Sequence, residues 1–193
     1  MGIRLVAVAV LAVVLLAGGA AGGAAADASW NATVNGTEVT LTYEGSGTSD
    51  DPYLINGTNA EMLAELQAIS HNQSKLNQHY KLTSDINASA TSGWNSGEGF
   101  IPIGHSGVGK FQGSLDGSEK IVSNMNINNS TEDIPVGLFS TVNGANVSNL
   151  TLSYNDISGD GEIGGIAGII EGNSDFYNLH VKADISGGGF FVP

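Results

Sequence analysis

Two stretches near the carboxyl end of the chain repeat one pattern: "VGLFSTVNGANVSNLTL" begins at Val136 and "IGGIAGIIEGNSDFYNLHV" begins at Ile163. At a shift of 28 residues, glycines and apolar residues of the first stretch meet similar residues of the second: Gly137, Leu138, Val142 and Gly144 against Gly165, Ile166, Ile170 and Gly172. After one inserted residue, Asn149-Leu150-x-Leu152 meets Asn178-Leu179-x-Val181. The chain therefore contains a repeat of about 28 residues.

A period of this length is typical of a solenoid, in which each repeat buries its apolar face against its neighbours. Helical solenoids are excluded because these repeats lack a 3.6-residue period, and the dense L-x-x-L-x-L pattern of leucine-rich repeats is absent. The apolar pieces are four to seven residues long and are separated by Gly, Asn, Ser and Asp, as in short strands and turns. The pattern predicts an all-β fold, a parallel β-helix whose coils are the repeats.

Stacked coils place equivalent residues of successive repeats side by side. We therefore expect Leu150 beside Leu179 and Leu138 beside Ile166, as rungs of parallel sheets. Asn149 and Asn178 should stack at one corner, where asparagine amides can bond to each other along the axis. A fainter upstream copy, Asn124-Met125-x-Ile127, predicts a further coil in the same alignment.

The amino-terminal segment has the pattern of a signal peptide. Arg4 precedes the apolar run Leu5–Ala17, and small residues ending in "AAA" follow, so residues 1–26 are predicted to be cleaved; a signal anchor is the alternative. Residues 27–50 are predicted to form a hairpin and a loop, because Asn35-Gly36 lies between β-rich flanks.

Residues 51–193 are predicted to form the β-helix domain, with repeats over 136–162 and 163–189. Thr58 and Glu61 have the spacing of a capping box, and Met62, Leu66 and Ile69 share one helical face. This predicts one helix over residues 59–70, which caps the amino end of the solenoid. "ISGGGFFVP" stops where another coil would begin, so we expect a truncated chain with an open carboxyl end that is unstable or aggregates in isolation.

The ordered series of motifs resembles a known family. "VGLFSTVNGANVSNLTL" and "GGIAGIIEGNSDFYNLHV" resemble the repeats of the GLUG-repeat family of exported right-handed β-helix proteins. The upstream series from "GTSDDPYLI" through "YKLTSDINAS" and "FIPIG" to "FQGSLDGSEKIVSNMNI" resembles the block that precedes such repeats. The resemblance covers residues 47–189. It implies a right-handed β-helix, secreted or at the cell surface, which is often adhesive, and it supplies no catalytic motif.

The chain is strongly acidic, with 19 Asp and Glu against 6 Lys and Arg. This charge repels nucleic acid and anionic membranes, so neither is expected as a partner. It suits a solvated surface, a protein for high salt, or a surface that binds calcium, and the net charge does not separate the three. The chain has no cysteine, so no disulfide holds it.

Asn-x-Ser/Thr sequons are about three times as frequent as the composition of the chain gives by chance. They are candidate N-glycosylation sites of an exported protein, although turn-rich β proteins also use Asn, Ser and Thr heavily. The candidates are Asn31, Asn35, Asn56, Asn72, Asn87, Asn128, Asn129, Asn146 and Asn149.

Catalytic and metal-binding patterns give weak signals. The histidines show no zinc-ligand spacing, and "GHSGVG" around Ser106 lacks the strand–turn–helix context of a nucleophile elbow. Most carboxylates lie in turn-like contexts: Asp116, Glu119, Asp156, Asp160, Glu162, Glu171 and Asp175. "DISGDGE" over 156–162 is a weak calcium candidate, and otherwise no cofactor is predicted. Four aromatic residues could stack on sugars, with the core as the other interpretation: Trp30, Trp94, Phe100 and Tyr177.

These observations predict a structural or adhesive module, secreted or at the cell surface, that is not an enzyme. Its partner would be an extracellular glycan or protein, and no membrane span would remain after cleavage of the signal. The alternative is a carbohydrate-binding or carbohydrate-degrading β-helix. A face lined by aromatics and paired carboxylates would favour the alternative, whereas a smooth Thr/Asn/Ser face would favour the module.

Overall fold

The computed structural model describes residues 28–130 and 134–187. The predicted signal peptide and the segment after Gly187, including the predicted truncated end, lie outside the described residues. The strands are β1 (Ala28–Val34), β2 (Thr37–Tyr43), β3 (Tyr53–Ile55), β4 (His79–Leu82), β5 (Ile86–Asn87), β6 (Ser114–Asn129), β7 (Phe139–Asn143), β8 (Asn146–Gly159), β9 (Ala167–Glu171), β10 (Asp175–Lys182) and β11 (Ile185–Gly187). One α-helix, α1 (Asn59–Ala68), and four 3-10 turns complete the described elements: Ile69–His71, Gln73–Lys75, Ser89–Gly93 and Asn95–Gly97.

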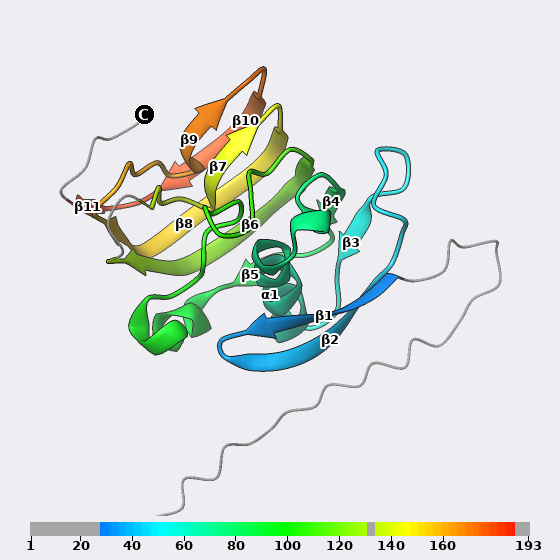
Figure 1. Ribbon diagram of the computed structural model, residues 1–193, viewed down its shortest axis with the longest axis horizontal. Helices are drawn as coiled ribbons and strands as arrows, with labels where there is room; N and C mark the ends of the chain where they lie inside the picture. The colour runs from blue at the N-terminus through cyan, green and yellow to red at the C-terminus, as the bar shows by residue number, and fades with distance from the viewer. Residues whose placement is uncertain (1–27, 131–133, 188–193) are drawn as a thin grey trace, which may run out of the picture.

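The strands form three sheets (Figure 1). Seven strands pair in parallel in the order β10-β8-β6-β4-β3, with β5 on β6 and β11 on β8. β7 and β9 form a second parallel sheet, whereas β1 and β2 are antiparallel around Asn35-Gly36, where both residues have positive φ. The fold is thus mostly β, as predicted, but its sheets are mixed. These strand pairings do not by themselves show a closed, right-handed β-helix. The predicted domain boundary between residues 50 and 51 stays a prediction.

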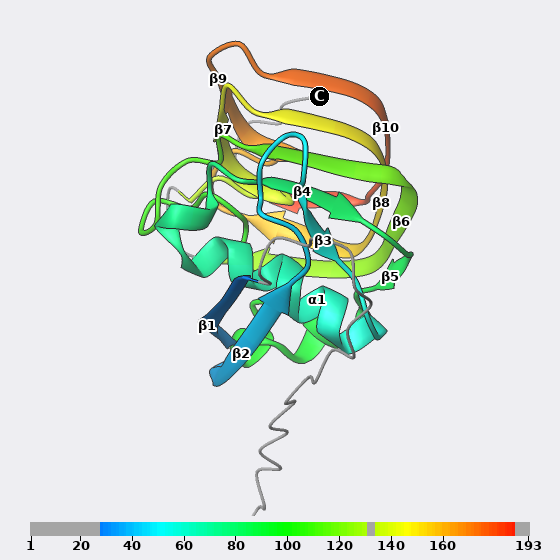
Figure 2. The ribbon, with the colours of Figure 1, turned by 90° about the vertical axis from the view of Figure 1, so that its right-hand side faces the viewer.

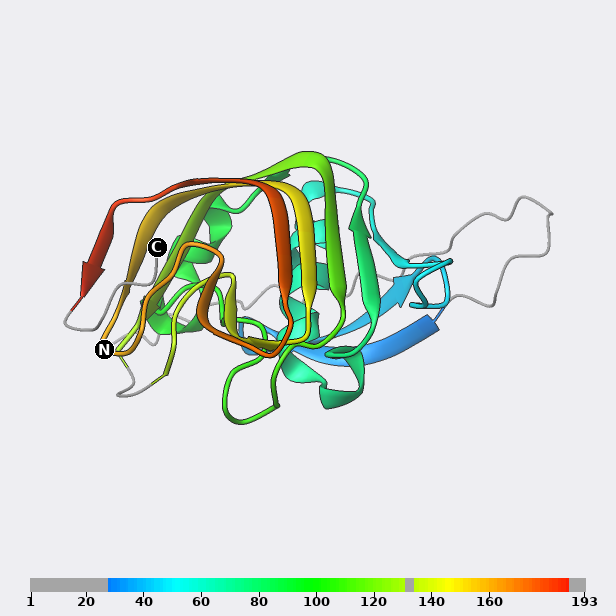
Figure 3. The ribbon, with the colours of Figure 1, turned by 90° about the horizontal axis from the view of Figure 1, so that it is seen from above.

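The two carboxyl-terminal repeats lie next to each other in parallel register. Leu179 of β10 pairs with Leu150 of β8, as predicted from the repeat. In the second parallel sheet, Phe139 pairs with Ala167 at the predicted shift of 28. Figure 3 shows these successive segments following one another around a common interior. The sequence repeat is therefore a structural repeat.

The predicted alignment of the fainter upstream copy is wrong. Met125 pairs with Tyr154, and the residue paired with Leu150 is Lys120. The reason is that the two motifs lie at different points of their strands: the part of β6 that aligns with Asn149 lies between Asp116 and Lys120, where Ser118 and Glu119 have positive φ. Asn124 also has positive φ but lies beyond this corner, so its likeness to Asn149 in the sequence does not reflect a shared position in the coil.

A column of aromatic side chains crosses the strands inside the molecule. Trp30 stacks on Tyr43 with ring centroids 4.0 Å apart, and contacts continue through Tyr53 and Tyr80. Phe111 then lies 4.7 Å from Phe139, centroid to centroid. Phe100 is in the core at 1% exposed, which excludes sugar stacking for it, whereas Trp30 and Trp94 are partly buried against the core. Rings from different segments of the chain thus meet in one column, and each buries a large apolar area.

The helix α1 covers the amino end of the stack, opposite the last strands (Figure 2). Met62, Leu66 and Ile69 are at most 3% exposed, as expected of a cap. The predicted capping box is present: the Thr58 hydroxyl accepts from the Glu61 N–H, and the Glu61 carboxylate accepts from the Thr58 N–H. α1 begins at Asn59, as predicted, and ends at Ala68, where the 3-10 turn Ile69–His71 continues it.

Thr58→Ala should lower the free energy of unfolding by about 1 kcal/mol, because it removes the hydroxyl acceptor of this cap. Thr58→Ser keeps the acceptor and should stay within about 0.5 kcal/mol of the wild type. Equilibrium denaturation of both variants measures the difference. Equal stability of the alanine and serine variants would show that the box does not support the cap.

Candidate functional site: a polar face of stacked side chains

One face of the large sheet presents polar side chains in rows. Buried and more exposed residues alternate on β4 and at the start of β6, and parallel pairing aligns the more exposed positions with residues of β8 and β10. Among the aligned residues, Ser148 of β8 is itself buried, at 3% exposed. One row is His79, Ser114, Asn146 and Asp175, and the next is Lys81, Asp116, Ser148 and Tyr177. We call these eight residues, with Asn149 and Asn178 at the adjoining corner, the polar face. Neighbouring strands lie about 4.8 Å apart, so each row repeats a side chain at that spacing.

A serine and a histidine contact each other in the first row. Nδ1 of His79 lies 2.7 Å from Oγ of Ser114, and both side chains are partly buried. A nucleophile and a base at hydrogen-bond distance are one part of a hydrolytic site, which also needs a third group to orient the base and donors for an oxyanion. Among the described contacts, only the His79–Ser114 pair of such a site is found. The pair therefore holds the two strands together and does not define a reaction.

Asp116 begins a ladder of hydrogen bonds along the corner. The Asn149 amide donates to the Asp116 carboxylate at 3.1 Å, and the Asn178 amide donates to the Asn149 oxygen at 2.9 Å. The stacking of Asn149 on Asn178 is thus confirmed. The Ser118 N–H also donates to Asp116 at 2.9 Å, and Nζ of Lys81 lies 3.8 Å from its other oxygen. The ladder ties three successive strands, β6, β8 and β10, along the axis.

Partial burial acts to raise the pKa of Asp116. Hydrogen bonds from Asn149 and Ser118, and the positive charge of Lys81, outweigh it, so the pKa is lowered. The carboxylate is therefore ionised at neutral pH and stays an acceptor at the end of the ladder. The role of Asp116 as the acceptor that begins the ladder was not predicted from the sequence. The repeat aligns Asn149 with Asn178, but it does not align Asp116 with either of them.

Asn149 should be the most sensitive residue of the polar face. Its φ is 53°, a left-handed conformation that favours Gly and Asn. Asn149→Gly loses two hydrogen bonds, at about 1 kcal/mol each, but keeps an allowed backbone. Asn149→Ala loses the same bonds and adds about 1 kcal/mol of backbone strain. Denaturant unfolding should rank wild type above glycine above alanine, and equal wild-type and glycine stabilities would mean that the ladder contributes nothing.

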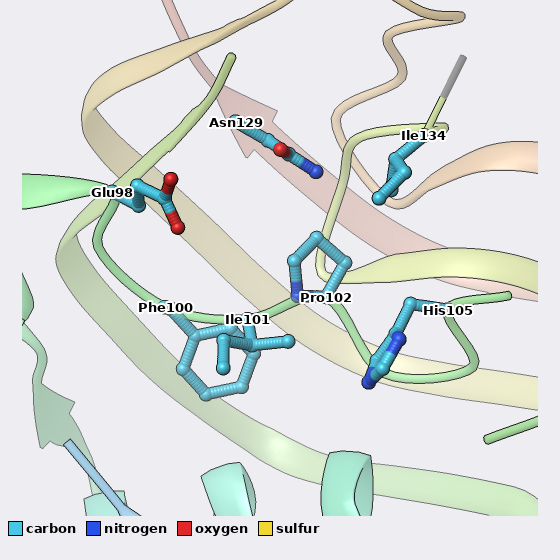
Figure 4. A pocket seen from close by; sticks show the side chains of 7 residues that line it. All are labelled: Glu98, Phe100, Ile101, Pro102, His105, Asn129 and Ile134. Atoms are coloured by element: carbon cyan, nitrogen blue, oxygen red, sulfur yellow. The ribbon is translucent and has the colours of Figure 1, made fainter. Parts of the chain in front are cut away.

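A small pocket of about 140 Å³ lies away from the polar face. Figure 4 shows Glu98 and His105 at opposite ends, with Ile101 and Pro102 between them and Phe100 at the floor. The Nε2 of His105 faces the Ser70 carbonyl at 3.2 Å, and the Gly107 N–H donates to Nδ1, which assigns the proton to Nε2. Burial lowers the pKa of His105, so the ring is neutral at pH 7. Both ring nitrogens are thus occupied, so His105 does not act as a free base in this pocket.

The structure separates the sequons by exposure. Five have exposed side chains: Asn31, Asn35, Asn87, Asn128 and Asn146. Four are partly buried: Asn56, Asn72, Asn129 and Asn149. In Asn149 the amide nitrogen, the atom that would carry a glycan, already donates to Asp116. The sequon pattern alone does not distinguish these two groups, because the difference comes from strand stacking.

The candidate ligands of metal ions do not converge. In the described part of the chain, no group of three or more His, Cys, Asp or Glu side chains is placed to hold a metal ion, including the segment 156–162. Glu171 instead pairs with Lys110 at 2.5 Å. Of the aromatic residues named as sugar-stacking candidates, Tyr177 is exposed, at 54%. The polar face therefore remains the candidate functional site, because it combines carboxylate, amide, hydroxyl, imidazole, amine and aromatic side chains on one surface.

The fold and this face define a class: a β-rich protein whose repeats stack in parallel register and present ordered polar rows. Residues 61–183, more than half of the chain, match the family described as M26 IgA1-specific metallo-endopeptidase N-terminal region. The chain belongs to this family. No solved structure matches the chain.

Halomucin of Haloquadratum walsbyi is a relative with 40% identity over 148 residues. The matched part is 73% of this chain but 2% of halomucin, so the chain spans a small fraction of that relative. Together, the family and this relative point to a surface-associated or exported protein. They do not show the predicted GLUG repeats.

The prediction that the chain is not an enzyme is contradicted by the family match, because the family is a region of metallo-endopeptidases. The sequence of the chain shows no catalytic motif from which membership in this family follows. The described residues do not fit the metal ion that the family name implies, as no cluster of ligands forms among them. Within residues 28–130 and 134–187, no helix has the length and apolar character needed to cross a membrane.

Proposed function

We propose that the chain is a structural or adhesive module of an exported cell-surface protein. In this proposal the parallel coils form a right-handed β-helix of GLUG-like repeats, with α1 as its amino-terminal cap. One observation carries the function: polar side chains recur in register across β4, β6, β8 and β10. A surface of this kind can bind an extended glycan or protein through many weak contacts that add up along the rows.

The composition of the rows supports the module over the carbohydrate-directed alternative. The rows hold two Ser, two Asp and one each of Asn, His and Lys, and their aromatic ring is that of Tyr177. The pocket at Glu98 and His105 contains no residue of the rows. A second pocket, of about 360 Å³, contains none either; it is lined by Gln73, Leu76, Asn77, Gly109, Lys110 and Gln112. Tyr177 beside Ser148 is the observation that favours the alternative, because an exposed ring in a polar row can stack on a sugar.

We also propose that the five exposed sequons carry glycans when the chain is made by a host that glycosylates Asn-x-Ser/Thr. Their side chains reach solvent, whereas a glycan on Asn149 would break the ladder to Asp116. Glycans at these positions would add bulky, soluble groups to a cell-surface protein. Site-resolved mass spectrometry should find glycans among these five and none on Asn149.

The proposed function is tested by measuring binding to an array of extracellular polysaccharides and glycoproteins. The array is probed with the free chain and with many copies of the chain immobilised on beads. The beads should bind at least tenfold more strongly than the free chain, and the variant Lys81→Ala/Tyr177→Ala should lose this gain. Glu38→Ala, on the exposed face of the hairpin, is the control and should bind as the wild type does. Absence of binding by the beads would overturn the adhesive role, and release of sugar fragments would establish the carbohydrate-degrading alternative.

A further inference from the structure

A polar pocket of about 360 Å³ lies between the turn Gln73–Lys75 and the segment that leads into β6. The residues that line it are Gln73, Leu76, Asn77, Gly109, Lys110 and Gln112. Sites for small molecules usually measure about 300–1,000 Å³, so the pocket is large enough for one. It contains no residue of the polar face and none of the pocket at His105. The pocket is therefore a separate candidate site.

Backbone contacts hold the walls of this pocket in place. The Leu76 N–H donates to the Gln73 carbonyl at 3.3 Å. The Leu76 carbonyl accepts from the N–H groups of Gln112 and Gly113, at 2.7 and 3.0 Å. Gly109 has a φ of 125°, which favours glycine, and a Cβ added there would lie 3.4 Å from Cδ1 of Leu76. The walls are thus fixed by the fold before a ligand binds, which lowers the ordering cost of binding.

Three amide side chains of the lining are available to a ligand. Gln73 and Gln112 are exposed, and neither side chain forms a hydrogen bond within the part of the chain that the structure describes. The Oδ1 of Asn77 accepts from the Gln78 amide at 2.9 Å, so its NH2 group is the donor that stays available. Each glutamine amide offers two N–H donors and a carbonyl acceptor. A hydroxyl also both donates and accepts, so one amide can bind two neighbouring hydroxyls at once.

The charge of the pocket is neutralised within the protein. Lys110 is the charged residue among those that line the pocket, and its Nζ lies 2.5 Å from Oε2 of Glu171. An anionic ligand would have to compete with Glu171 for this ammonium group, in a chain of net charge −13. A cationic ligand would be repelled by the ammonium group itself. The pocket therefore favours an uncharged ligand that is rich in hydrogen-bonding groups.

We propose that this pocket binds one neutral sugar ring through its hydroxyl groups, with Gln73, Asn77 and Gln112 determining the specificity. The three amides come from two segments on different sides of the pocket. This arrangement suits a compact ring with hydroxyls around its rim better than an extended peptide, whose amide groups follow one line. The site goes beyond the proposed adhesive function and uses none of the polar face, so either proposal can fail alone.

The test is titration of the isotope-labelled chain with the methyl glycosides of glucose, galactose and mannose, followed by nuclear magnetic resonance. At least one glycoside should bind with a millimolar dissociation constant and shift the side-chain NH2 signals of Gln73, Asn77 and Gln112 together. Gln73→Ala and Gln112→Ala should each weaken this binding about fivefold, and the double variant at least about tenfold, because each removes hydrogen bonds to the sugar. A deoxy analogue that lacks a contacted hydroxyl should also bind about fivefold more weakly.

The matched control is Asn155→Ala, which removes an exposed amide of β8 outside the pocket and should bind as the wild type does. Thermal melting followed by circular dichroism should show that the glutamine variants are folded, since both side chains are exposed. The proposal would be overturned by wild-type affinity in the double variant or by the absence of binding to every glycoside. Tighter binding of glucuronate or of a phosphorylated sugar would overturn it as well. Signals that shift on the polar face and not in the pocket would place the sugar at the other site.

Discussion

Phe111→Ala should lower the free energy of unfolding by about 3–5 kcal/mol. Phe111 is fully buried in the aromatic column, between Tyr80 and Phe139. Its backbone also joins neighbouring segments, since its N–H donates to Thr141 and its carbonyl accepts from the Asn143 N–H. The substitution leaves these backbone bonds in place, so the loss measures the ring alone. Urea denaturation at a fixed protein concentration provides the measurement.

Ile121→Ala is the matched control for this loss. Ile121 is also in the large sheet, on β6, but its side chain is 42% exposed, so its removal should cost less than about 1 kcal/mol. Similar losses for the two variants would mean that the column is not packed as described. A large loss for Phe111 alone locates the stability of the stack in its interior.

The second large effect is a dependence of stability on pH that comes from one carboxyl group. Glu65 of α1 is 5% exposed, and burial raises its pKa to about 8, from an ordinary value near 4.5. The charges of Glu61 and Glu44 also raise this pKa, and the Asn56 N–H, 3.0 Å from Oε2, lowers it. The folded protein therefore keeps a proton that the unfolded chain releases. The stabilisation is complete below about pH 4.5 and is lost as the pH rises through about 8.

Glu65→Gln should remove this dependence, because the amide stays neutral at every pH. Between pH 5 and pH 8 the wild type should lose about 1 kcal/mol of unfolding free energy per pH unit, whereas the variant should change little. Above pH 8 the variant should therefore be the more stable protein. Glu38→Gln, at an exposed position of β2, should behave as the wild type does. Parallel pH curves for wild type and Glu65→Gln would contradict the assignment.

The features that could be predicted from the sequence are those that recur at a fixed spacing. Leu150 beside Leu179 and Asn149 beside Asn178 follow from aligning two repeats. The cap was predictable for a different reason, since Thr58 and Glu61 carry a local signal that needs no tertiary context.

The features that the sequence does not predict depend on irregular geometry or on distant residues. Ser118 and Glu119 form the corner of β6 that aligns with Asn149, and Asn124 lies beyond it, so matching the two asparagines by motif misplaces Met125. The aromatic column is hidden for a related reason: its rings come from strands with no common period. The match to the N-terminal region of M26 metallo-endopeptidases does not follow from metal-ligand patterns, because no such ligands are gathered in the described residues.

The central claim is that each repeat is one coil, stacked on the next in parallel register, and a pair of engineered cysteines tests it directly. The chain has no cysteine of its own. Thr151 of β8 pairs with His180 of β10, and neighbouring strands place such pairs within disulfide distance. Thr151→Cys/His180→Cys should oxidise to an intramolecular disulfide, seen as one cross-linked peptide in monomer of unchanged mass. Thr151→Cys/Val181→Cys, which points its two side chains to opposite faces, should keep both thiols free. Cross-linking of the second pair in place of the first, or of neither, would contradict the stacked register.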